Sequence, residues 1–361
     1  MDNNESSMRE IEIRKLEHIF LCSYCDVEYD KTTLLENVEL IHRGTCGVNF
    51  NDIETEIKLF GKRLSAPIIV SGMTGGHSKA KEINKNIAKA VEELGLGMGV
   101  GSQRAAIVNK DLTDTYSIVR DYTSNLVIGN LGAVNFIVDN WDEETIDKAV
   151  EMIDADAMAI HFNPLQEIIQ PEGDLNFKNL LKIKDAIINY KKKYKNIPFI
   201  AKQVGEGFSR KDALILKDIG FDAIDVQGSG GTSWAKVEIY RVKDVNKKNL
   251  LKKFSNWGIP TAISIFEVKS VYNGIVIGSG GIRSGLDIAK CIAVGCDCCS
   301  VALPILKASL KGWEEVVKVL EEYIKELKIA MFLVGSENIE ELKKVPYVVK
   351  GTLREWIKNC K

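Results

Sequence analysis

The sequence predicts an α/β fold, a (β/α)8 TIM barrel that follows an N-terminal extension. Short apolar runs alternate with longer segments in which apolar residues recur every three to four positions. Continuous apolar runs are typical of parallel strands that are covered on both faces. Eight such units within about 250 residues fit a closed barrel better than an open doubly wound sheet, which is the alternative. We therefore expect the extension over residues 1–65 and the barrel over 66–361.

The expected strands and helices follow one another in chain order. The strands are predicted at residues 67–70, 97–100, 126–129, 157–160, 199–202, 223–226, 275–278 and 298–302. Amphipathic helices are predicted between them at residues 80–94, 143–153, 175–194, 209–219 and 284–294. From Trp313 onward, the pattern predicts the last barrel helix and then a tail rich in Lys and Glu.

Charge and composition argue against several classes of protein. The formal net charge is -2, and the basic runs at 191–193 and 247–248 sit among helix-like polar positions without an interleaved aromatic stacking platform, so nucleic acid is not expected as a partner. The apolar runs are much shorter than the roughly 20 residues of a membrane span, and residues 1–10 are too polar for a signal peptide. We expect a cytoplasmic protein that acts on a small molecule and has no membrane partner.

The eight cysteines are scattered along the chain, which favours reduced thiols over a disulfide framework. Cys22 and Cys25 have the spacing of a metal or redox pair, but a second such pair is missing. Cys298 and Cys299 lie in a predicted strand, where adjacent residues face opposite ways. Both groups are therefore predicted to be structural.

A dense group of polar residues follows the fourth predicted strand. His161 and Asn163 are two residues apart and share a face, and Pro164 is expected to end the strand, which leaves Gln166 and Glu167 in a loop. Functional groups of a TIM barrel gather at the C-terminal ends of its strands. An imidazole, two amides and a carboxylate thus meet in one small volume, which favours a functional site over a simple hydrogen-bonded strand end.

The loops after strands seven and eight are the usual phosphate site of this fold. The run Gly280-Gly281-Ile282-Arg283 offers close backbone approach and a positive charge. Lys202 ends the fifth strand, where it would either stabilise the negative charge of a reduced flavin near N1 or form a salt bridge within the barrel.

Two adjacent cations and an imidazole lie near the N-terminus, namely Arg14, Lys15 and His18. Taken alone, they indicate a solvated amphipathic helix. Together with Arg104, they could hold a diphosphate that a magnesium ion on Glu167 also bridges, because one carboxylate suffices when substrate oxygens and waters complete the shell.

Several motifs together resemble the type 2 isopentenyl-diphosphate isomerases over nearly the whole chain. The specific ones are His161-x-Asn163-Pro164-Leu165-Gln166-Glu167 and Ser102-Gln103-Arg104. The others are Arg14-Lys15-x-x-His18, Met73-Thr74-Gly75-Gly76, Lys202-x-Val204-Gly205-x-Gly207 and Gly230-Gly231-Thr232-Ser233-Trp234. The resemblance implies an enzyme that uses FMN and Mg²⁺ to interconvert isopentenyl and dimethylallyl diphosphates. It also implies NAD(P)H as the flavin reductant and a homo-oligomer, either a tetramer or an octamer.

The resemblance also implies roles for individual residues. FMN would be held by Gly72, Met73, Thr74, Ser102, Asn130, Lys202, Thr232, Gly281, Ile282, Arg283, Ala302 and Leu303. Substrate would be bound by Arg14, Lys15, His18, Ser102, Gln103, Arg104, His161, Asn163 and Gln166, and the metal by Glu167. The chain departs from the family at Phe162, often Leu, which should face away from the site, and at Gln203, often an acid.

Double-bond migration needs one proton added and one removed, yet a pair of carboxylates or cysteines is not evident near the hydrocarbon end. We expect reduced flavin to act as acid and base near N5, with Gln166 positioning or relaying the proton and Trp234 shielding an allylic cation. Glu238 is either an alternative acid or a charge on a helix surface. His161 is assigned to substrate binding first and to proton transfer second.

Two other functions remain open at this point. One is an FMN-dependent oxidoreductase of a hydroxy acid or nucleotide on the same barrel, which would need a hydride donor or catalytic cysteine near N5. The other is a non-catalytic flavin-binding protein, which would need the phosphate loops but neither Gln166 and Glu167 nor the N-terminal cations.

Overall fold

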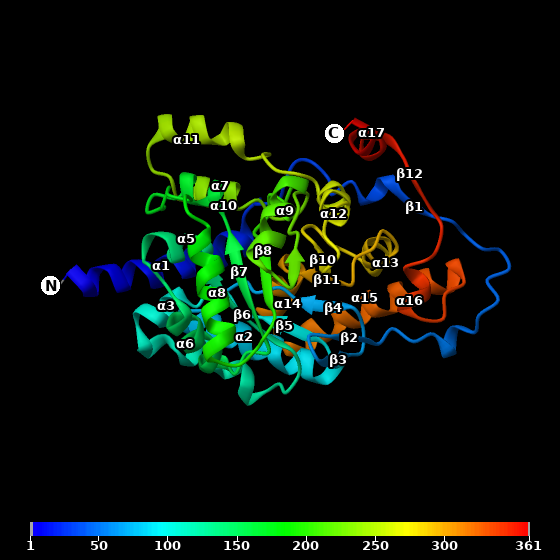
Figure 1. Cartoon of the computed structure of the whole chain (residues 1–361), viewed down its shortest axis with the longest axis horizontal. Helices are drawn as coiled ribbons and strands as arrows, with labels where there is room; N and C mark the ends of the chain where they lie inside the picture. The colour runs from blue at the N-terminus through cyan, green and yellow to red at the C-terminus, as the bar shows by residue number, and fades with distance from the viewer. Residues whose placement is uncertain (1–2, 360–361) are drawn as a thin grey trace.

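Eight parallel strands form a closed barrel in the computed structural model, which describes the backbone of residues 3–359 and the side chains of residues 12–359. The predicted barrel is therefore confirmed, and the doubly wound alternative is wrong (Figure 1). The strands are β4 (Ile68–Val70), β5 (Gly97–Gly99), β6 (Val127–Gly132), β7 (Ala157–Phe162), β8 (Phe199–Gln203), β9 (Ala223–Asp225), β10 (Ile275–Ser279) and β11 (Cys298–Val301).

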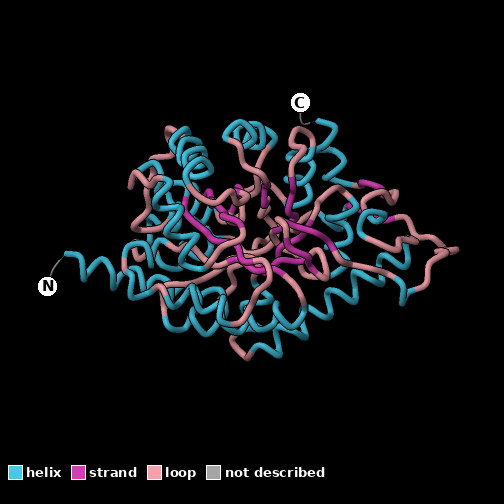
Figure 2. The backbone as a smooth tube through the Cα atoms, turned by 60° about the horizontal axis from the view of Figure 1, so that its bottom comes forward, coloured by secondary structure: helices cyan, strands magenta, loops and turns pink. Residues whose placement is uncertain are grey.

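Each barrel strand pairs with its neighbours in chain order, and β11 closes the ring against β4 through the register Ser300↔Ile69. A ring of helices surrounds the strands (Figure 2). The longer ones are α2 (Ser78–Leu94), α6 (Glu143–Ile153), α8 (Leu181–Lys193), α9 (Arg210–Ile219), α12 (Thr261–Lys269), α13 (Gly285–Ala293) and α15 (Trp313–Val334). Several end at a left-handed glycine, such as Gly95 after α2, which satisfies the last carbonyl groups of the helix.

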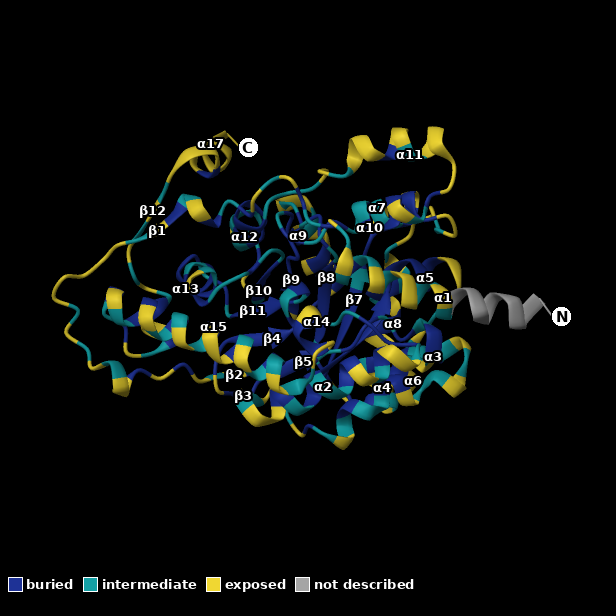
Figure 3. Ribbon diagram, turned by 180° about the vertical axis from the view of Figure 1, so that it is seen from behind, coloured by how far each residue is buried: buried dark blue, intermediate teal, exposed yellow. Residues whose placement is uncertain are grey.

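The barrel interior is a small apolar core of its own, and the strands are buried on both faces (Figure 3). Leu59 and Leu64 join this interior cluster from the hairpin of β2 (Ile57–Leu59) and β3 (Lys62–Leu64). Since β3 leads directly into β4, the hairpin lies at the N-terminal end of the barrel and closes it. Polar functional groups are therefore expected at the opposite, C-terminal end of the barrel.

The N-terminal extension and the C-terminal tail meet in a small sheet. β1 (Val38–Leu40) pairs antiparallel with β12 (Tyr347–Val349), through the register Val38↔Val349. The expected tail thus contains a strand, which the sequence interpretation missed because a pairing between such distant segments leaves no local pattern. The tail also holds α16 (Ile339–Leu342) and α17 (Gly351–Asn359). The domain boundary at residue 65 stays a prediction, although the two ends of the chain are joined.

Two helix predictions need correction. Gln166 and Glu167 lie on the short helix α7 (Pro164–Ile169) and not in a loop, because proline at the first helical position has a compatible φ and no N–H to leave unpaired. The helix predicted from residue 175 begins only at Leu181, since the Asn176 side chain accepts from Lys178 N and Asn179 has a φ of 65°.

Short helices follow the strands at the C-terminal end of the barrel, and α1 (Asn3–Tyr24) comes to the same end from the extension. They are α3 (Arg104–Val108), α4 (Asp114–Ser117), α5 (Ala133–Val138), α10 (Trp234–Arg241), α11 (Val245–Leu251) and α14 (Leu303–Ser309). Single 3-10 turns occur at Leu35–Asn37, Phe50–Asp52, Lys110–Leu112, Ile118–Asp121 and Lys252–Phe254. Within the described part of the chain, none of the helices has the length and hydropathy that crossing a bilayer would require.

Candidate active site

Two adjoining cavities lie at the C-terminal end of the barrel. We call the first, of about 880 Å³, the glycine-lined cavity because Gly72, Gly205, Gly228, Gly280 and Gly281 contribute to its wall. The second, of about 850 Å³, is the polar cavity, whose wall carries cations, amides and an imidazole. The cavities share the residues Lys15, His18, Gly72, Met73, Lys202, Val204 and Trp234.

The glycine-lined cavity depends on the absence of side chains. A Cβ at Gly72 would lie 2.1 Å from the carbonyl oxygen of Val100. Gly281 has a φ of 72°, and a Cβ there would lie 2.4 Å from Thr33 Cγ2. Arg283 lines the same cavity and forms an ion pair with Glu28 of the N-terminal extension. The backbone can therefore approach an anion closely, with one guanidinium group beside it.

Lys202 extends from β8 into the wall between the two cavities. It is buried, so desolvation lowers the pKa of its ammonium group, while Asp225 and Glu206 act to raise that pKa. Its Nζ donates to the carbonyl of Gln203 at 3.0 Å. Asp225, its register neighbour on β9, accepts hydrogen bonds from Gln227 and Ser279 instead. The Lys202 ammonium is thus available to a cavity ligand, and the salt bridge considered as its alternative role is not among its contacts.

His161 is held as a neutral imidazole in the polar cavity. Its Nδ1 lies 2.8 Å from Asn130 Oδ1, while Asn130 Nδ2 donates to the carbonyl of Val100, so Nδ1 of His161 carries the proton. Burial, together with the charges of the nearby Lys202 and Lys15, lowers the pKa of His161 to about 3. His161 can therefore accept a hydrogen bond at Nε2 but is not a cationic acid at neutral pH.

Glu167 lies at the edge of the polar cavity and is nearly fully buried. Its two oxygens accept from Asn163 Nδ2 at 2.7 Å, Gln170 Nε2 at 2.5 Å and the backbone N–H of Asp174 at 2.8 Å. Burial raises the pKa of Glu167, and these donors oppose that rise. Asn163 Oδ1 is buried beside it without a hydrogen-bond partner. A carboxylate and an unsatisfied amide oxygen are therefore close together.

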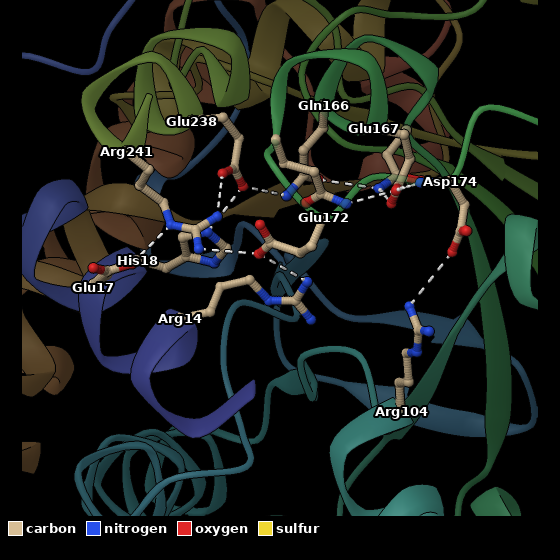
Figure 4. Close-up of polar contacts among 12 residues, drawn as sticks. Arg14, Glu17, His18, Arg104, Gln166, Glu167, Glu172, Asp174, Glu238 and Arg241 are labelled. Carbon is tan, nitrogen blue, oxygen red and sulfur yellow. Dashed lines mark hydrogen bonds and ion pairs between the residues drawn. The ribbon is translucent and has the colours of Figure 1, made fainter. Parts of the chain in front are cut away.

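Glu238 is fully buried on α10 beneath the polar cavity, so the alternative of a helix-surface charge is wrong. Its Oε1 accepts from Gln166 Nε2 at 2.9 Å and lies 2.9 Å from His18 Nε2. Burial alone would raise the pKa of Glu238, but His18, Arg241 and Gln166 lower it to about 2. Glu238 is thus an ionised acceptor that fixes one end of the Gln166 amide (Figure 4).

The N-terminal cations meet the rest of the site within one chain. Lys15 and His18 line both cavities, which is inconsistent with a merely solvated helix. Burial, together with the charges of neighbouring Arg14 and Arg104, lowers the pKa of Lys15 to about 7. Arg14 pairs with Glu172 at 3.3 Å. Arg14, Lys15 and Arg104 therefore line the polar cavity together.

Gln103 is the predicted substrate-binding residue that the fold turns away from both cavities. Its Nε2 donates to the carbonyl of Ala149 at 2.7 Å, and its Oε1 accepts from the backbone N–H of Asn130 at 2.9 Å. The side chain is fully buried. These contacts join α6 to β6, so the geometry gives Gln103 a structural role in place of the expected one.

The structure shows the contacts of Phe162 and Gln203, the two residues that depart from the family pattern. Phe162 faces away from the site as expected, with its ring 5.9 Å and 6.0 Å from the rings of Phe208 and Phe221. The Oε1 of Gln203 accepts from the backbone N–H groups of residues 204–206 at 2.5, 2.8 and 2.7 Å. A neutral amide can therefore stabilise this turn without a carboxylate.

All twelve residues expected to hold FMN line one or the other cavity, and so do the expected substrate and metal residues other than Gln103. Trp234 lies in the shared wall with its ring 5.0 Å from that of His18. The sequence interpretation missed Gln170, which helical spacing could have found, because it lies three residues after Glu167. It also missed Glu172, Asp174 and Arg241, which reach the site from loop and helix ends.

The cysteines have the environments expected of structural thiols. Cys22 is buried against the glycine-lined cavity, and burial raises its pKa to about 12. Cys298 faces the barrel interior and Cys299 the surrounding helices, as strand alternation predicts. The seven cysteines among the described residues are unbridged.

Comparisons with known proteins agree with this geometry. The model of the FMN-dependent dehydrogenase family matches residues 173–348. A mandelate oxidase structure aligns with a TM-score of 0.60 at 18% identity, covering 97% of this chain and 100% of that one. A putative lactate oxidase of Pediococcus acidilactici aligns with a TM-score of 0.64 at 18% identity, covering 97% and 95%. Fold and site together define an FMN-binding TIM-barrel protein.

Closer relatives narrow this class. The isopentenyl-diphosphate delta-isomerase of Methanocaldococcus jannaschii is 86% identical over 357 residues, which is 99% of each chain. Those of Methanococcus aeolicus and Archaeoglobus fulgidus are 65% and 47% identical, over 96% and 95% of this chain and 99% and 97% of theirs. The chain belongs to the isopentenyl-diphosphate delta-isomerase family, in its FMN-dependent type 2 form.

Proposed function

We propose that the protein interconverts isopentenyl diphosphate and dimethylallyl diphosphate, with reduced FMN in the glycine-lined cavity and the substrate in the polar cavity. The observation that carries this proposal is the shared wall of the two cavities, where Lys202, Trp234 and His18 contribute to both. Because the two cavities adjoin, the flavin and the hydrocarbon chain of the substrate would both lie beside these shared residues.

The residues of the glycine-lined cavity fit FMN. Gly280, Gly281 and Arg283 would hold its phosphate, because the first two have positive φ and the third supplies charge. Thr74, Thr232 and Ser102 offer hydrogen bonds, and Lys202 would stabilise negative charge near N1 of the reduced ring. When bound, reduced FMN would supply an acid and base near N5.

The chain's own residues would bind and orient the substrate. Arg14, Lys15 and Arg104 lie at the mouth of the polar cavity, where they would hold the diphosphate. His161 and Asn163 would contact the substrate deeper in the cavity. The Gln166 amide, held by Glu238 and Asn163, would position or relay the proton beside the migrating double bond.

Ionisation of Glu238 bears on the source of the proton. A carboxyl group with a pKa of about 2 has no proton to donate at neutral pH. Glu238 is therefore proposed as the acceptor that orients Gln166, and the acid role stays with the flavin, while Gln166 positions or relays the proton. Trp234 would shield an allylic cation from water, because its ring lies in the wall of both cavities.

Magnesium is proposed to bind at Glu167. The described residues contain no cluster of three or more His, Cys, Asp or Glu side chains suited to a metal. A single carboxylate still suits Mg²⁺, which keeps waters and takes substrate phosphate oxygens. The unpartnered Asn163 Oδ1 beside Glu167 supports this assignment, because it adds a second hard oxygen.

We further propose NAD(P)H as the flavin reductant, a homo-oligomer of four or eight chains, and a cytoplasmic location. The oligomer is supported by Ile13, Leu16, Phe20 and Tyr24, which leave an apolar stripe of α1 exposed. Unbridged thiols support the location. Light scattering coupled to size exclusion tests the oligomer, and a monomer at micromolar concentration would contradict it.

One experiment separates the candidate functions. Enzyme reduced under anaerobic conditions is incubated with isopentenyl diphosphate and MgCl2, while product and flavin spectrum are followed. Dimethylallyl diphosphate with flavin that stays reduced supports the isomerase. Net oxidation of the flavin during turnover would instead indicate an oxidoreductase, and a lack of product would indicate a non-catalytic flavin protein.

A further inference from the structure

Arg241 is the last residue of α10 and does not line the glycine-lined or the polar cavity. Its guanidinium group nevertheless contacts three carboxylates from three parts of the chain. Nε donates to Glu17 Oε2 at 2.8 Å, NH1 donates to Glu238 Oε2 at 2.7 Å, and NH2 lies 3.0 Å from Glu172 Oε1 (Figure 4). All three nitrogens are thus engaged, and only 12% of the side chain is exposed.

The central carboxylate of this cluster is the one that touches the site. Glu238 is fully buried, and its two oxygens divide their contacts. Oε2 faces Arg241, while Oε1 meets both Gln166 and His18. Because Arg241 holds one oxygen in place, it determines where the other oxygen points. The planar guanidinium fork suits this task better than a lysine would.

We propose that Arg241 is a positioning residue for isomerisation, which holds Glu238 ionised and aimed at Gln166 while tying α10 to the substrate-binding helix α1. This inference rests on the proposed function. Arg241 joins Glu238, beneath the proton-transfer region, to Glu17 on α1 and to Glu172, which also pairs with Arg14. Some of these contacts hold the cationic side chains proposed to bind the diphosphate, and others hold Gln166. Both sets therefore converge on one guanidinium group.

The other groups that contact Glu238 among the described residues meet Oε1 and not the Oε2 atom that Arg241 holds. His18 from α1 lies 2.9 Å from Glu238 Oε1 and also lowers the pKa of Glu238. Burial lowers the pKa of His18 itself, while Glu238 acts to raise it. Lys15 and Cys22, also on α1, act on Glu238 only through longer-range charge. Gln166 from α7 is neutral. Without Arg241, Oε2 of the buried carboxyl group would lose its hydrogen-bond partner, and desolvation would favour the protonated form more strongly.

The test compares pre-reduced holoenzymes carrying Arg241→Met, Arg241→Lys or Lys236→Met. Lys236 is the matched control, because it also lies on α10 and pairs with Asp30 of the N-terminal extension at 2.8 Å, but does not contact Glu238. FMN content monitors folding of each variant. The kcat, the KM for isopentenyl diphosphate and the pH dependence of kcat are measured for these three variants and for the wild type.

For Arg241→Met, kcat is expected to fall about 10- to 100-fold, the range for a lost charged hydrogen bond. The acid limb of the kcat profile should move to higher pH by about one unit or more, because Glu238 then protonates more easily. Arg241→Lys should recover part of both effects, and Lys236→Met should stay within about twofold of wild type.

Three results would overturn the role of Arg241. They are unchanged kcat in Arg241→Met, a fall in kcat with an unmoved acid limb, and an equal loss in Lys236→Met. If Arg241→Met does not fold, Arg241→Lys must still show a smaller change in the same direction in both kcat and acid limb, or the proposal fails. If the wild-type enzyme does not isomerise isopentenyl diphosphate, the proposed function itself is wrong. If the wild-type enzyme turns over normally and the kcat of the Arg241 variants is unchanged, only this inference is wrong.

Discussion

Asn130 Oδ1 on β6 accepts a 2.8 Å hydrogen bond from His161 Nδ1 on the neighbouring strand β7. The contact fixes the tautomer of a buried imidazole, and the amide is itself held by its Nδ2 bond to Val100. Adjacent barrel strands therefore prepare a hydrogen-bond acceptor, His161 Nε2, before any ligand arrives.

His161 should stay neutral across the working pH range. Burial depresses its pKa to about 3, below the usual value of about 6.5, so the unfolded chain binds a proton that the folded chain does not. The stability that this group contributes is fully present above about pH 6.5 and is lost as pH falls toward 3. In ¹H–¹⁵N spectra, the His161 ring signals should not titrate between pH 5 and 8, as assigned by comparison with His161→Gln. A midpoint near neutrality would contradict the assignment.

Gln166→Ala should cut isomerisation sharply while leaving flavin binding intact. The amide lies between Glu238 and Asn163 in the polar cavity and does not line the glycine-lined one. A loss of about 100-fold in kcat is expected for a group that positions or relays a proton. Flavin content and absorbance serve as the control. Unchanged kcat would remove Gln166 from the mechanism.

Glu167→Gln should raise the Mg²⁺ concentration needed for half-maximal activity by about tenfold or more, because the charged metal ligand is lost. The substitution keeps the size of the side chain and an oxygen near Asn163 and Gln170. Titration with MgCl2 after chelator treatment measures the effect, with flavin binding as the control. Equal Mg²⁺ dependence in both proteins would indicate that the metal binds at a different residue.

Gly72→Ala should destabilise the glycine-lined cavity by about 1–3 kcal/mol, because the new methyl group meets backbone that cannot move aside. The nearest atom, the carbonyl oxygen of Val100, would lie 2.1 Å away. Gly44→Ala is the matched control, since a Cβ there meets nothing within 4 Å. Thermal unfolding and FMN content report the difference. Equal melting temperatures and FMN contents of the two variants would contradict tight packing at Gly72.

Gln103→Ala distinguishes a structural residue from a substrate-binding one. It removes two buried hydrogen bonds, to Ala149 and Asn130, which should cost about 1–3 kcal/mol. The melting temperature should fall, while the KM for isopentenyl diphosphate stays the same. A raised KM with an unchanged melting temperature would instead support the substrate-binding role that the family resemblance implies.

Much of the site could be predicted because barrel topology and motif agree. Once the strands are numbered, each strand end is a candidate site, so Lys202, Asn130 and His161 fall where the structure has them. Gln103 shows the limit of this reasoning. Its neighbours Ser102 and Arg104 line the polar cavity, but a buried amide can satisfy its four hydrogen-bonding positions only where the backbone offers partners.

The sequence by itself determined the periodicities that fold into a barrel, the glycines that let backbone approach a ligand, and the polar residues at strand ends. These properties are local, since they depend on residue types and spacing within a few turns of chain. Only the tertiary structure decided which charges meet. The pairing of β1 with β12, the burial of Glu238 and the contacts of Arg241 with Glu17 and Glu172 join segments far apart in the chain. Electrostatic environment depends on distance and desolvation in space, which spacing along a sequence does not encode.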